Sequence, residues 1–194
     1  MTDIRLYDTT LRDGAQREGI SFSVKDKLHI AQKLDEFGIH YIEGGWPGTN
    51  PKDNEFFQKA LESGFNNARL VAFGSTRKAG TSVEDDVNIK ALLDSGAPVV
   101  TLVGKSSAPQ VEKVLATSLD ENINMVADSI RFLKSKGRDV FLDAEHFFDG
   151  YKANKEYSLK VLKSAAEAGA DCLVLCDTNG GALPEEIAEA TRTV

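Results

Sequence analysis

Apolar and polar positions follow a repeating order along this chain. A short apolar run is followed by a longer stretch in which apolar residues recur at helical spacing, as in residues 25–37 and 154–168, and the order then repeats. Two of the runs, near 98–103 and 171–176, are almost entirely apolar, as in parallel strands that are covered on both faces. Six strands are predicted in all, near residues 3–8, 39–44, 69–73, 98–103, 138–143 and 171–176.

Glycine marks the boundary between most helical stretches and the strand that follows. It suits the left-handed backbone conformation that commonly ends a helix, where other residues meet a steric penalty. At the opposite end of such a stretch, Asn154 stands where an N-cap is expected. The glycines that mark these boundaries are Gly38, Gly64, Gly96, Gly137 and Gly169.

The repeated βα units predict the α/β fold class, with which two architectures are compatible: a doubly wound sheet and the TIM (β/α)8 barrel. A doubly wound nucleotide-binding domain would be expected to carry a G-x-G-x-x-G or P-loop motif, and the sequence contains neither. A complete barrel needs eight units and typically about 250 residues. This chain has 194 residues and about six units, so it is either an open sheet or a barrel cut short.

Composition narrows the class of protein. The chain is 41% hydrophobic and 27% charged, which is ordinary for a globular domain. Its net charge of -7 disfavours non-specific binding to nucleic acid or to an anionic membrane, and no apolar run approaches the length of a membrane span. The two cysteines lie in one apolar run and suggest no disulfide framework. We therefore expect a cytoplasmic protein that binds neither nucleic acid nor membrane.

Ionisable and polar side chains recur where the predicted strands end. In both architectures, the chemistry gathers at the carboxyl ends of the strands. Glycines stand beside several of these side chains, which allows a ligand to approach the backbone closely. The recurrence predicts a functional site at this edge of the sheet. Its candidate residues are Arg12, Asp13, Gln16, Glu43, Lys105, Asp143, Glu145, Asp177 and Thr178.

Purely structural roles are open for several of these residues. Arg12 and Glu43 could form a structural ion pair that closes the mouth of the barrel, and Asp143 could simply cap or solvate a strand end. Lys105 could be a surface lysine, or the lysine of a Schiff-base aldolase, for which it is the only candidate at a strand end.

The cysteines and histidines offer little chemistry. Cys172 and Cys176 share one strand face at even spacing and are expected to be inert core residues. His29 and His40 are expected to be structural. His146, which follows Glu145, is the only histidine near the predicted site.

The stretches "LYDTTLRDGAQREG", "YIEGGWPGTNPKDNEFF", "LDAEHFFDGYKAN" and "LVLCDTNGG" together resemble the DRE-TIM metallolyase superfamily, which includes isopropylmalate, homocitrate and citramalate synthases and hydroxymethylglutaryl-CoA lyases. The stretches "EGGWPG", "AFGSTRK" and "DAEHFFDGYKAN" are most similar to the (R)-citramalate synthases. The resemblance covers essentially the whole chain. It implies a truncated TIM barrel, in which residues 1–194 are the N-terminal part of a single catalytic domain.

The resemblance also implies a reaction, the Claisen-type condensation of acetyl-CoA with a 2-keto acid, here pyruvate, to give citramalate for branched-chain amino-acid biosynthesis. In such enzymes the residue that matches Asp13 binds a divalent metal (Mg, Mn or Zn). The residue that matches Arg12 points at the keto oxygen, where negative charge grows as the acetyl-CoA enolate attacks. Glu43 matches a glutamate that holds this arginine in place.

Three further residues match positions on the substrate side of the site. Gln16 matches a polar position near the substrate, Glu145 a carboxylate beside the keto acid, and Thr178 a hydroxyl that binds its carboxylate. The main alternative is a 2-isopropylmalate synthase, which would take 2-oxoisovalerate for the leucine pathway. A non-catalytic half-barrel that only binds ligands is a further alternative, and a lyase is less favoured.

The sequence departs from the family in its metal ligands. The family completes its metal site with a His-x-His pair on the seventh strand, and the three histidines here do not form one. The metal site is therefore expected to be incomplete, with Asp13 as its single ligand in this chain. We expect the isolated chain to bind metal weakly, to lack synthase activity and to self-associate through an open edge of the sheet. The full-length protein is expected to be a homodimer.

Overall fold

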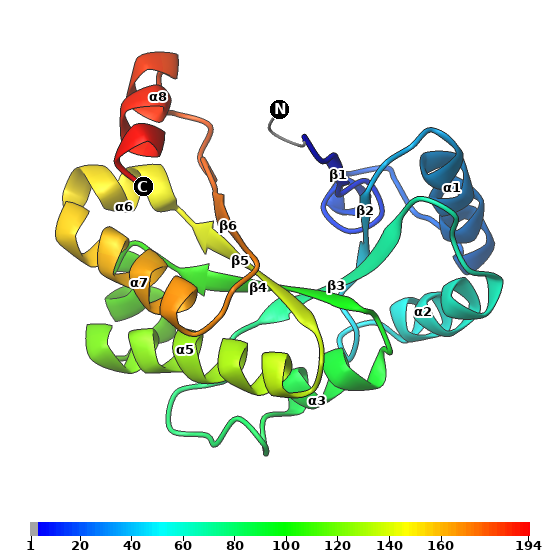
Figure 1. Cartoon of the computed structure of the whole chain (residues 1–194), viewed down its shortest axis with the longest axis horizontal. Helices are drawn as coiled ribbons and strands as arrows, with labels where there is room; N and C mark the ends of the chain where they lie inside the picture. The colour runs from blue at the N-terminus through cyan, green and yellow to red at the C-terminus, as the bar shows by residue number, and fades with distance from the viewer. Residues whose placement is uncertain (1–3) are drawn as a thin grey trace. The chain divides into compact units, whose positions relative to one another are not determined.

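The strands lie in one sheet in the order in which they occur along the chain. The computed structural model describes residues 4–194, and within them six strands are ordered β1-β2-β3-β4-β5-β6 (Figure 1). Pairing is parallel between β1 and β2, β2 and β3, and β5 and β6. The strands are β1 (Tyr7–Asp8), β2 (Tyr41–Gly45), β3 (Arg69–Ser75), β4 (Val99–Lys105), β5 (Asp139–Glu145) and β6 (Cys172–Leu175).

This consecutive order confirms the topology of a TIM barrel and excludes a doubly wound sheet, in which the strand order reverses partway. Helices separate the strands, as predicted. They are η1 (Gly14–Gln16), α1 (Val24–Glu36), α2 (Pro51–Ser63), α3 (Val87–Asp94), α4 (Ala108–Gln110), η2 (Val111–Leu115), α5 (Leu119–Ser135), α6 (Phe147–Ala153), α7 (Lys155–Glu167) and α8 (Pro184–Thr193).

Most predicted boundaries agree with the structure to within two residues. All five boundary glycines have positive φ, between 69° and 96°. The side chain of Asn154 caps α7 by accepting a hydrogen bond from the Tyr157 N–H at 3.0 Å, as predicted. The first strand is shorter than predicted, since β1 begins at Tyr7, and residue 3 of the predicted range lies outside the described residues.

The cysteine prediction was wrong in one respect. Cys172 is exposed and Cys176 is only partly buried, so neither is a core residue. The reason is the position of β6, which is the last strand of the described sheet and pairs with β5 on one side only. Its apolar sequence resembles that of a strand covered on both faces, but all four of its residues retain exposed surface. Partial burial still raises the pKa of the Cys172 thiol, and the carboxylates of Asp143 and Asp171 add to the rise.

The described residues form two compact units. The first comprises the residues up to Gly74 together with Lys90–Thr101, and the second comprises Ser75–Ile89 and Leu102–Val194. In the first unit, α1 and α2 lie beside β2 (Figure 1). In the second, β5, α6, α7 and α8 contribute the buried cluster of Ala144, Phe147, Phe148, Leu162 and Ala190.

Asp35 links the end of α1 to the approach to β3 within the first unit. Its buried carboxylate accepts hydrogen bonds from the backbone N–H groups of Asn66, Asn67 and Ala68, at 3.0, 2.7 and 2.7 Å. Burial alone would raise the pKa of Asp35, but these three donors outweigh it and hold the pKa below its ordinary value.

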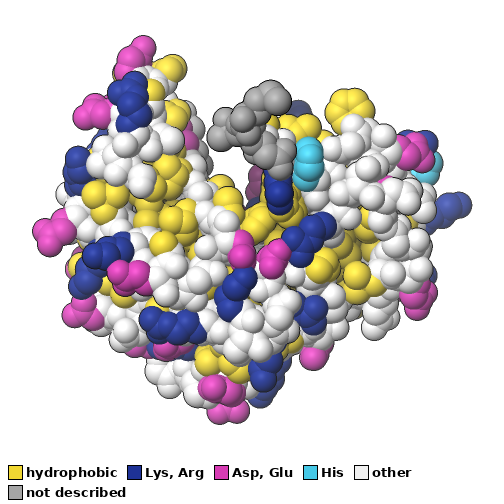
Figure 2. Space-filling view, viewed as in Figure 1, with side chains coloured by type: hydrophobic (Ala, Val, Ile, Leu, Met, Phe, Trp, Pro, Cys, Tyr) yellow, Lys and Arg dark blue, Asp and Glu magenta, His cyan; other side chains and the backbone are white. Residues whose placement is uncertain are grey.

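Two surface properties bear on function. On the face drawn in Figure 2, acidic and basic side chains of the described residues are interspersed. Across residues 4–194, none of the helices has the length and apolar character needed to cross a membrane.

Candidate active site

Arg12 is fixed in the first unit by contacts on several sides of its guanidinium group. After β1 the chain turns, with the N–H groups of Arg12 and Gly14 both donating to the Thr9 carbonyl at 3.1 Å. Arg12 Nε then donates to Glu43 Oε1 at 2.5 Å, and Nη1 donates to Asp13 Oδ1 at 3.1 Å. The guanidinium carbon lies 3.8 Å from the centre of the Phe73 ring. The ion pair that the sequence suggested between Arg12 and Glu43 is therefore present.

Glu43 is fully buried within β2, two residues before its end, and uses both carboxylate oxygens. Oε1 accepts from Arg12, while Oε2 accepts from the Tyr7 hydroxyl at 2.5 Å. The Tyr7 oxygen also lies 2.7 Å from Thr101 Oγ1. Burial raises the pKa of Glu43, and the charge of Arg12 together with the Tyr7 hydrogen bond acts against that rise. With both oxygens occupied, Glu43 is placed to orient Arg12 rather than to transfer protons.

A pocket of about 280 Å³ opens beside Arg12. Its lining includes Arg12 and Gln16 from the segment after β1, and Trp46 from the segment after β2. Ile20 and Phe22 add apolar surface. Within residues 4–194, no hydrogen-bond partner is present for Arg12 Nη2, so this nitrogen still has N–H donors for a ligand. The pocket is of a size and polarity suited to a small anion.

Asp13 is the residue expected to bind metal, and its side chain is 63% exposed. One of its oxygens already accepts from Arg12. Among residues 4–194 there is no group of three or more His, Cys, Asp or Glu side chains that could together hold a metal ion. The described residues thus offer a single carboxylate, which does not by itself make a site for a divalent cation.

Glu145 lies at the end of β5 in the second unit and is already paired. Its carboxylate forms an ion pair with Lys105 of β4, whose side chain is only 19% exposed. The Glu145 carbonyl accepts from both the N–H and the hydroxyl of Ser106, at 3.3 and 2.8 Å. Lys105 is therefore a partly buried ion-pair partner and not an isolated surface lysine. A substrate at Glu145 would have to share that carboxylate with Lys105.

Thr178 lies beside the end of β5 as well. Its hydroxyl accepts a hydrogen bond from the His146 N–H at 2.9 Å. His146 has a positive φ of 55°, which is uncommon for a residue other than glycine. Its Nδ1 lies 3.5 Å from Asp149 Oδ2, which also accepts from Asn179 at 2.6 Å. These contacts join the segment after β6 to the start of α6, a linkage that the sequence did not reveal.

Two other acidic candidates have structural contacts. Asp177 accepts from the Ala182 N–H at 3.1 Å and so stabilises the turn before α8. Asp143 lies within β5 opposite Val174 of β6, and not beyond the strand end.

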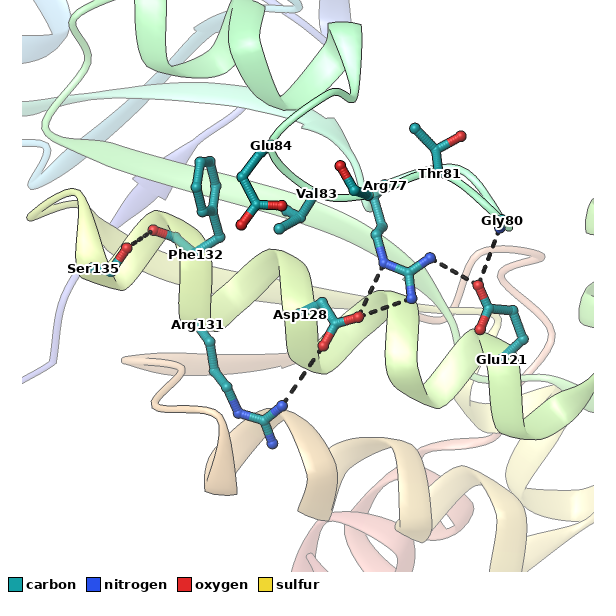
Figure 3. Close-up of a pocket in the computed structure, with 11 residues that line it drawn as sticks. Arg77, Gly80, Thr81, Val83, Glu84, Glu121, Asp128, Arg131, Phe132 and Ser135 are labelled. Atoms are coloured by element: carbon teal, nitrogen blue, oxygen red, sulfur yellow. Dashed lines mark hydrogen bonds and ion pairs between the residues drawn. The ribbon is translucent and has the colours of Figure 1, made fainter.

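Arg77 organises a second hollow, of about 680 Å³, on the surface of the second unit (Figure 3). The side chain is buried and donates to Asp128 Oδ2 through Nε and Nη2, at 3.1 and 2.8 Å. Nη1 donates to Glu121 Oε1 at 2.7 Å, and the Gly80 N–H donates to the same oxygen at 3.2 Å. Its hydrogen bond with Arg77 holds the pKa of Glu121 below its ordinary value.

This arrangement ties the loop that follows β3 to α5, and within it Arg77 is paired with both Glu121 and Asp128. No role for Arg77 was predicted from the sequence. A signal was nevertheless present, because Glu121 and Asp128 are two helical turns apart and so share one face of α5. The hollow is best explained as a structural ion-pair network.

Comparisons with known proteins agree with this topology. A family model described as HMGL-like matches residues 3–194. An (R)-citramalate synthase from Streptomyces coelicolor is 60% identical over 97% of this chain, and one from Aquifex aeolicus is 56% identical over 98%. A 2-isopropylmalate synthase from Shouchella clausii is 30% identical over 97%. The chain spans 36% of the length of the first two relatives and 35% of the third.

Solved structures show the same fold. A hydroxymethylglutaryl-CoA lyase from Bacillus subtilis superposes with a TM-score of 0.78 at 15% identity, covering 100% of this chain and 64% of that one. The corresponding lyase from Pseudomonas aeruginosa gives 0.75 at 19% identity, covering 98% and 63%. At such low identity, the likeness supports the fold alone.

Proposed function

Because the chain belongs to the HMGL-like family, we propose that it supplies part of the active site of a synthase that condenses acetyl-CoA with pyruvate to form (R)-citramalate. Relatives named (R)-citramalate synthase, 53–60% identical to this chain, support this product. The single observation that carries the proposal is the geometry of Arg12. It is a largely buried cation, fixed on one edge by Glu43, with N–H donors remaining beside a small pocket.

The proposed reaction needs a cation where charge develops. The methyl carbon of acetyl-CoA gives a proton to a base and attacks the keto carbon of pyruvate, so that a carbon–carbon bond forms and the keto oxygen gains the electron pair of its π bond. Arg12 Nη2 donates to this oxygen, and the interaction strengthens as the negative charge grows. The oxygen then takes up a proton, and water cleaves the thioester to release CoA thiol and a carboxylate.

The remaining candidate residues have roles on the substrate side. Gln16 lines the same pocket as Arg12, and it is proposed to donate to the keto acid. Glu145 and Thr178 are proposed to contact the keto acid and its carboxylate, respectively. Asp13 is proposed as one ligand of a divalent metal (Mg²⁺, Mn²⁺ or Zn²⁺).

A 2-isopropylmalate synthase would use the same chemistry with the larger keto acid 2-oxoisovalerate. A relative of that name is considerably less similar to this chain than the citramalate synthases are. Pyruvate is therefore the proposed substrate.

The test is release of free thiol from acetyl-CoA by the natural protein that contains these residues, assayed with pyruvate, 2-oxobutyrate, 2-oxoisovalerate and 2-oxoglutarate. We expect the highest kcat/KM with pyruvate, and citramalate as the product by chromatography. A clear preference for 2-oxoisovalerate would replace the proposal with the isopropylmalate reaction. Thiol release that no keto acid stimulates would favour a chain that only binds ligands.

A further inference from the structure

A buried ion pair lies beneath the end of β2, and both of its residues line the same pocket as Arg12. Lys27 of α1 and Asp53 of α2 are 6% and 7% exposed, and Lys27 Nζ pairs with Asp53 Oδ1. The same Nζ donates to the Gly44 carbonyl at 2.8 Å. The other Asp53 oxygen accepts from the Trp46 N–H at 3.0 Å. The pair therefore binds the backbone on both sides of Gly45.

Asp53 packs closely against the backbone at this point. Pairing between β2 and β3 shifts register between Glu43 and Gly45, as in a β-bulge, which redirects the side chains around it. Gly45 has φ of 151°, and a Cβ there would lie 2.5 Å from the carboxyl carbon of Asp53. The Asp53 carboxylate thus occupies the space that a side chain at position 45 would need.

Two short paths connect this bend to Arg12. The first runs through Glu43, which directly precedes Gly44 and holds Arg12 Nε. The second runs through Trp46, whose ring packs edge-on against Phe73 with centroids 5.3 Å apart, and the Arg12 guanidinium lies over that same Phe73 ring. A shift of the bend would move both supports of Arg12.

We propose that Lys27 and Asp53 are positioning residues, which set the orientation of Arg12 by fixing the backbone from Gly44 to Trp46. The predicted effect on kcat rests on the proposed function, whereas the predicted effect on the orientation of Arg12 does not. A buried ion pair is a weak source of stability, because the desolvation of both charges opposes their attraction. Here each partner also binds backbone of the site, which gives the buried charges a role beyond stability.

The principal variant is Asp53→Asn, which keeps the shape of the side chain but removes its charge. The matched control is Glu55→Gln, which removes a charge from an exposed ion pair with Lys59 on the same helix. The first readout is the NMR signal of the Arg12 Nε–H in this chain, which reports the short hydrogen bond to Glu43. We expect Asp53→Asn to shift or broaden this signal, and Glu55→Gln to leave it unchanged.

The second readout is steady-state kinetics of the natural protein that contains these residues, measured where circular dichroism shows each variant to be folded. Displacement of a catalytic group by about 1 Å can cost about 10²-fold. We expect Asp53→Asn to lower kcat by about 10- to 100-fold with a smaller change in the KM for the keto acid. A wild-type kcat per folded molecule, or an unchanged Arg12 signal, would overturn the proposal.

A second variant tests the proposal independently, in case Asp53→Asn does not fold. Phe73→Leu keeps an apolar side chain but removes the ring that links Trp46 to Arg12, and we expect it to lower kcat in the same way. Wild-type kcat in folded Phe73→Leu would refute the second path. If the wild-type protein shows no synthase activity, the proposed function fails, and the NMR signal of Arg12 still decides the positioning role.

Discussion

Arg12 Nε and Glu43 Oε1 are 2.5 Å apart, and the Glu43 side chain has no exposed surface. A planar guanidinium bound along one edge cannot rotate freely, so its remaining donors face a fixed direction. The second oxygen of Glu43 is held by Tyr7, which fixes the carboxylate in turn. The arrangement is that of a preorganised hydrogen-bond donor, whose dipoles need not reorient during the reaction.

Replacement of Arg12 should therefore reduce the rate of the chemical step. In the natural protein that contains these residues, Arg12→Ala should lower kcat by about 10²–10³, the usual range for the loss of one such donor. Arg12→Lys should restore only part of the rate, because an ammonium cannot bind Glu43 and the substrate through one planar group. Steady-state kinetics checks this, and a rise in KM alone would show that Arg12 only binds substrate.

Asp35 predicts a dependence of stability on pH. Its pKa lies below the ordinary value of 3.8, so its contribution to folding is present above that pH and is lost as the pH falls through the lower folded-state pKa. At pH 7, Asp35→Asn should reduce the free energy of unfolding by about 1–3 kcal/mol. Urea unfolding of both proteins should show this difference shrinking below about pH 4. A difference that stays constant down to pH 3 would contradict the assignment.

Arg77 should contribute to stability through its ion pairs. Arg77→Met would leave Glu121 and Asp128 without their main partner, but these side chains are 27% and 42% exposed, so solvent compensates for part of the loss. We expect a decrease of about 1–3 kcal/mol in the free energy of unfolding. The control is Arg131→Met. The Arg131 side chain is 60% exposed and lies 3.8 Å from Asp128, so this substitution should lower the free energy of unfolding by less than about 0.5 kcal/mol. Equal effects of the two variants in urea unfolding would refute this account.

Metal binding by the chain itself should be weak. One exposed carboxylate at Asp13, already hydrogen-bonded to Arg12, offers little to an ion that must give up its hydration shell. Calorimetric titration with Mg²⁺, Mn²⁺ and Zn²⁺ should give dissociation constants of about 1 mM or weaker. Tight stoichiometric binding that Asp13→Asn abolishes would show that further ligands converge on Asp13.

Self-association should occur through β6. Among the described strands it is the last of the sheet, and its apolar residues Leu173, Val174 and Leu175 are all partly exposed. Such a strand can pair with a second copy. Light scattering should show a mass that increases with concentration, and Val174→Lys should reduce it, since a charged side chain on an edge strand opposes pairing. A monodisperse monomer at high concentration would rule this out.

Local patterns in the sequence were sufficient to predict the order and type of the elements. Helical spacing, strand-like runs and boundary glycines each depend on neighbouring residues, so they are readable before the fold is known. The ion pair of Lys27 and Asp53 was not predictable in this way. Both residues stand on amphipathic helices where a charged side chain normally faces solvent, and only tertiary packing of α1 and α2 against β2 buries them together.

Burial at the edge of the sheet was the other property that the sequence did not predict. The run that forms β6 is as apolar as a central strand, and sequence alone could not show that only one neighbour covers it. The left-handed conformation of His146 was equally hidden, since its N–H donates to Thr178, which belongs to a later segment.

Positions 45 and 53 cannot vary independently during evolution. The carboxylate of Asp53 fills the volume that any side chain at position 45 would require, and the backbone at position 45 is one that side chains rarely adopt. A substitution of Gly45 would become sterically possible only after Asp53 had been replaced by a smaller residue. That earlier change would already have removed the acceptor for the Trp46 N–H. A change of both residues, made one substitution at a time, therefore passes through a protein in which the backbone around Gly45 is held less firmly. This should keep Gly45 and Asp53 together in descendants of this sequence.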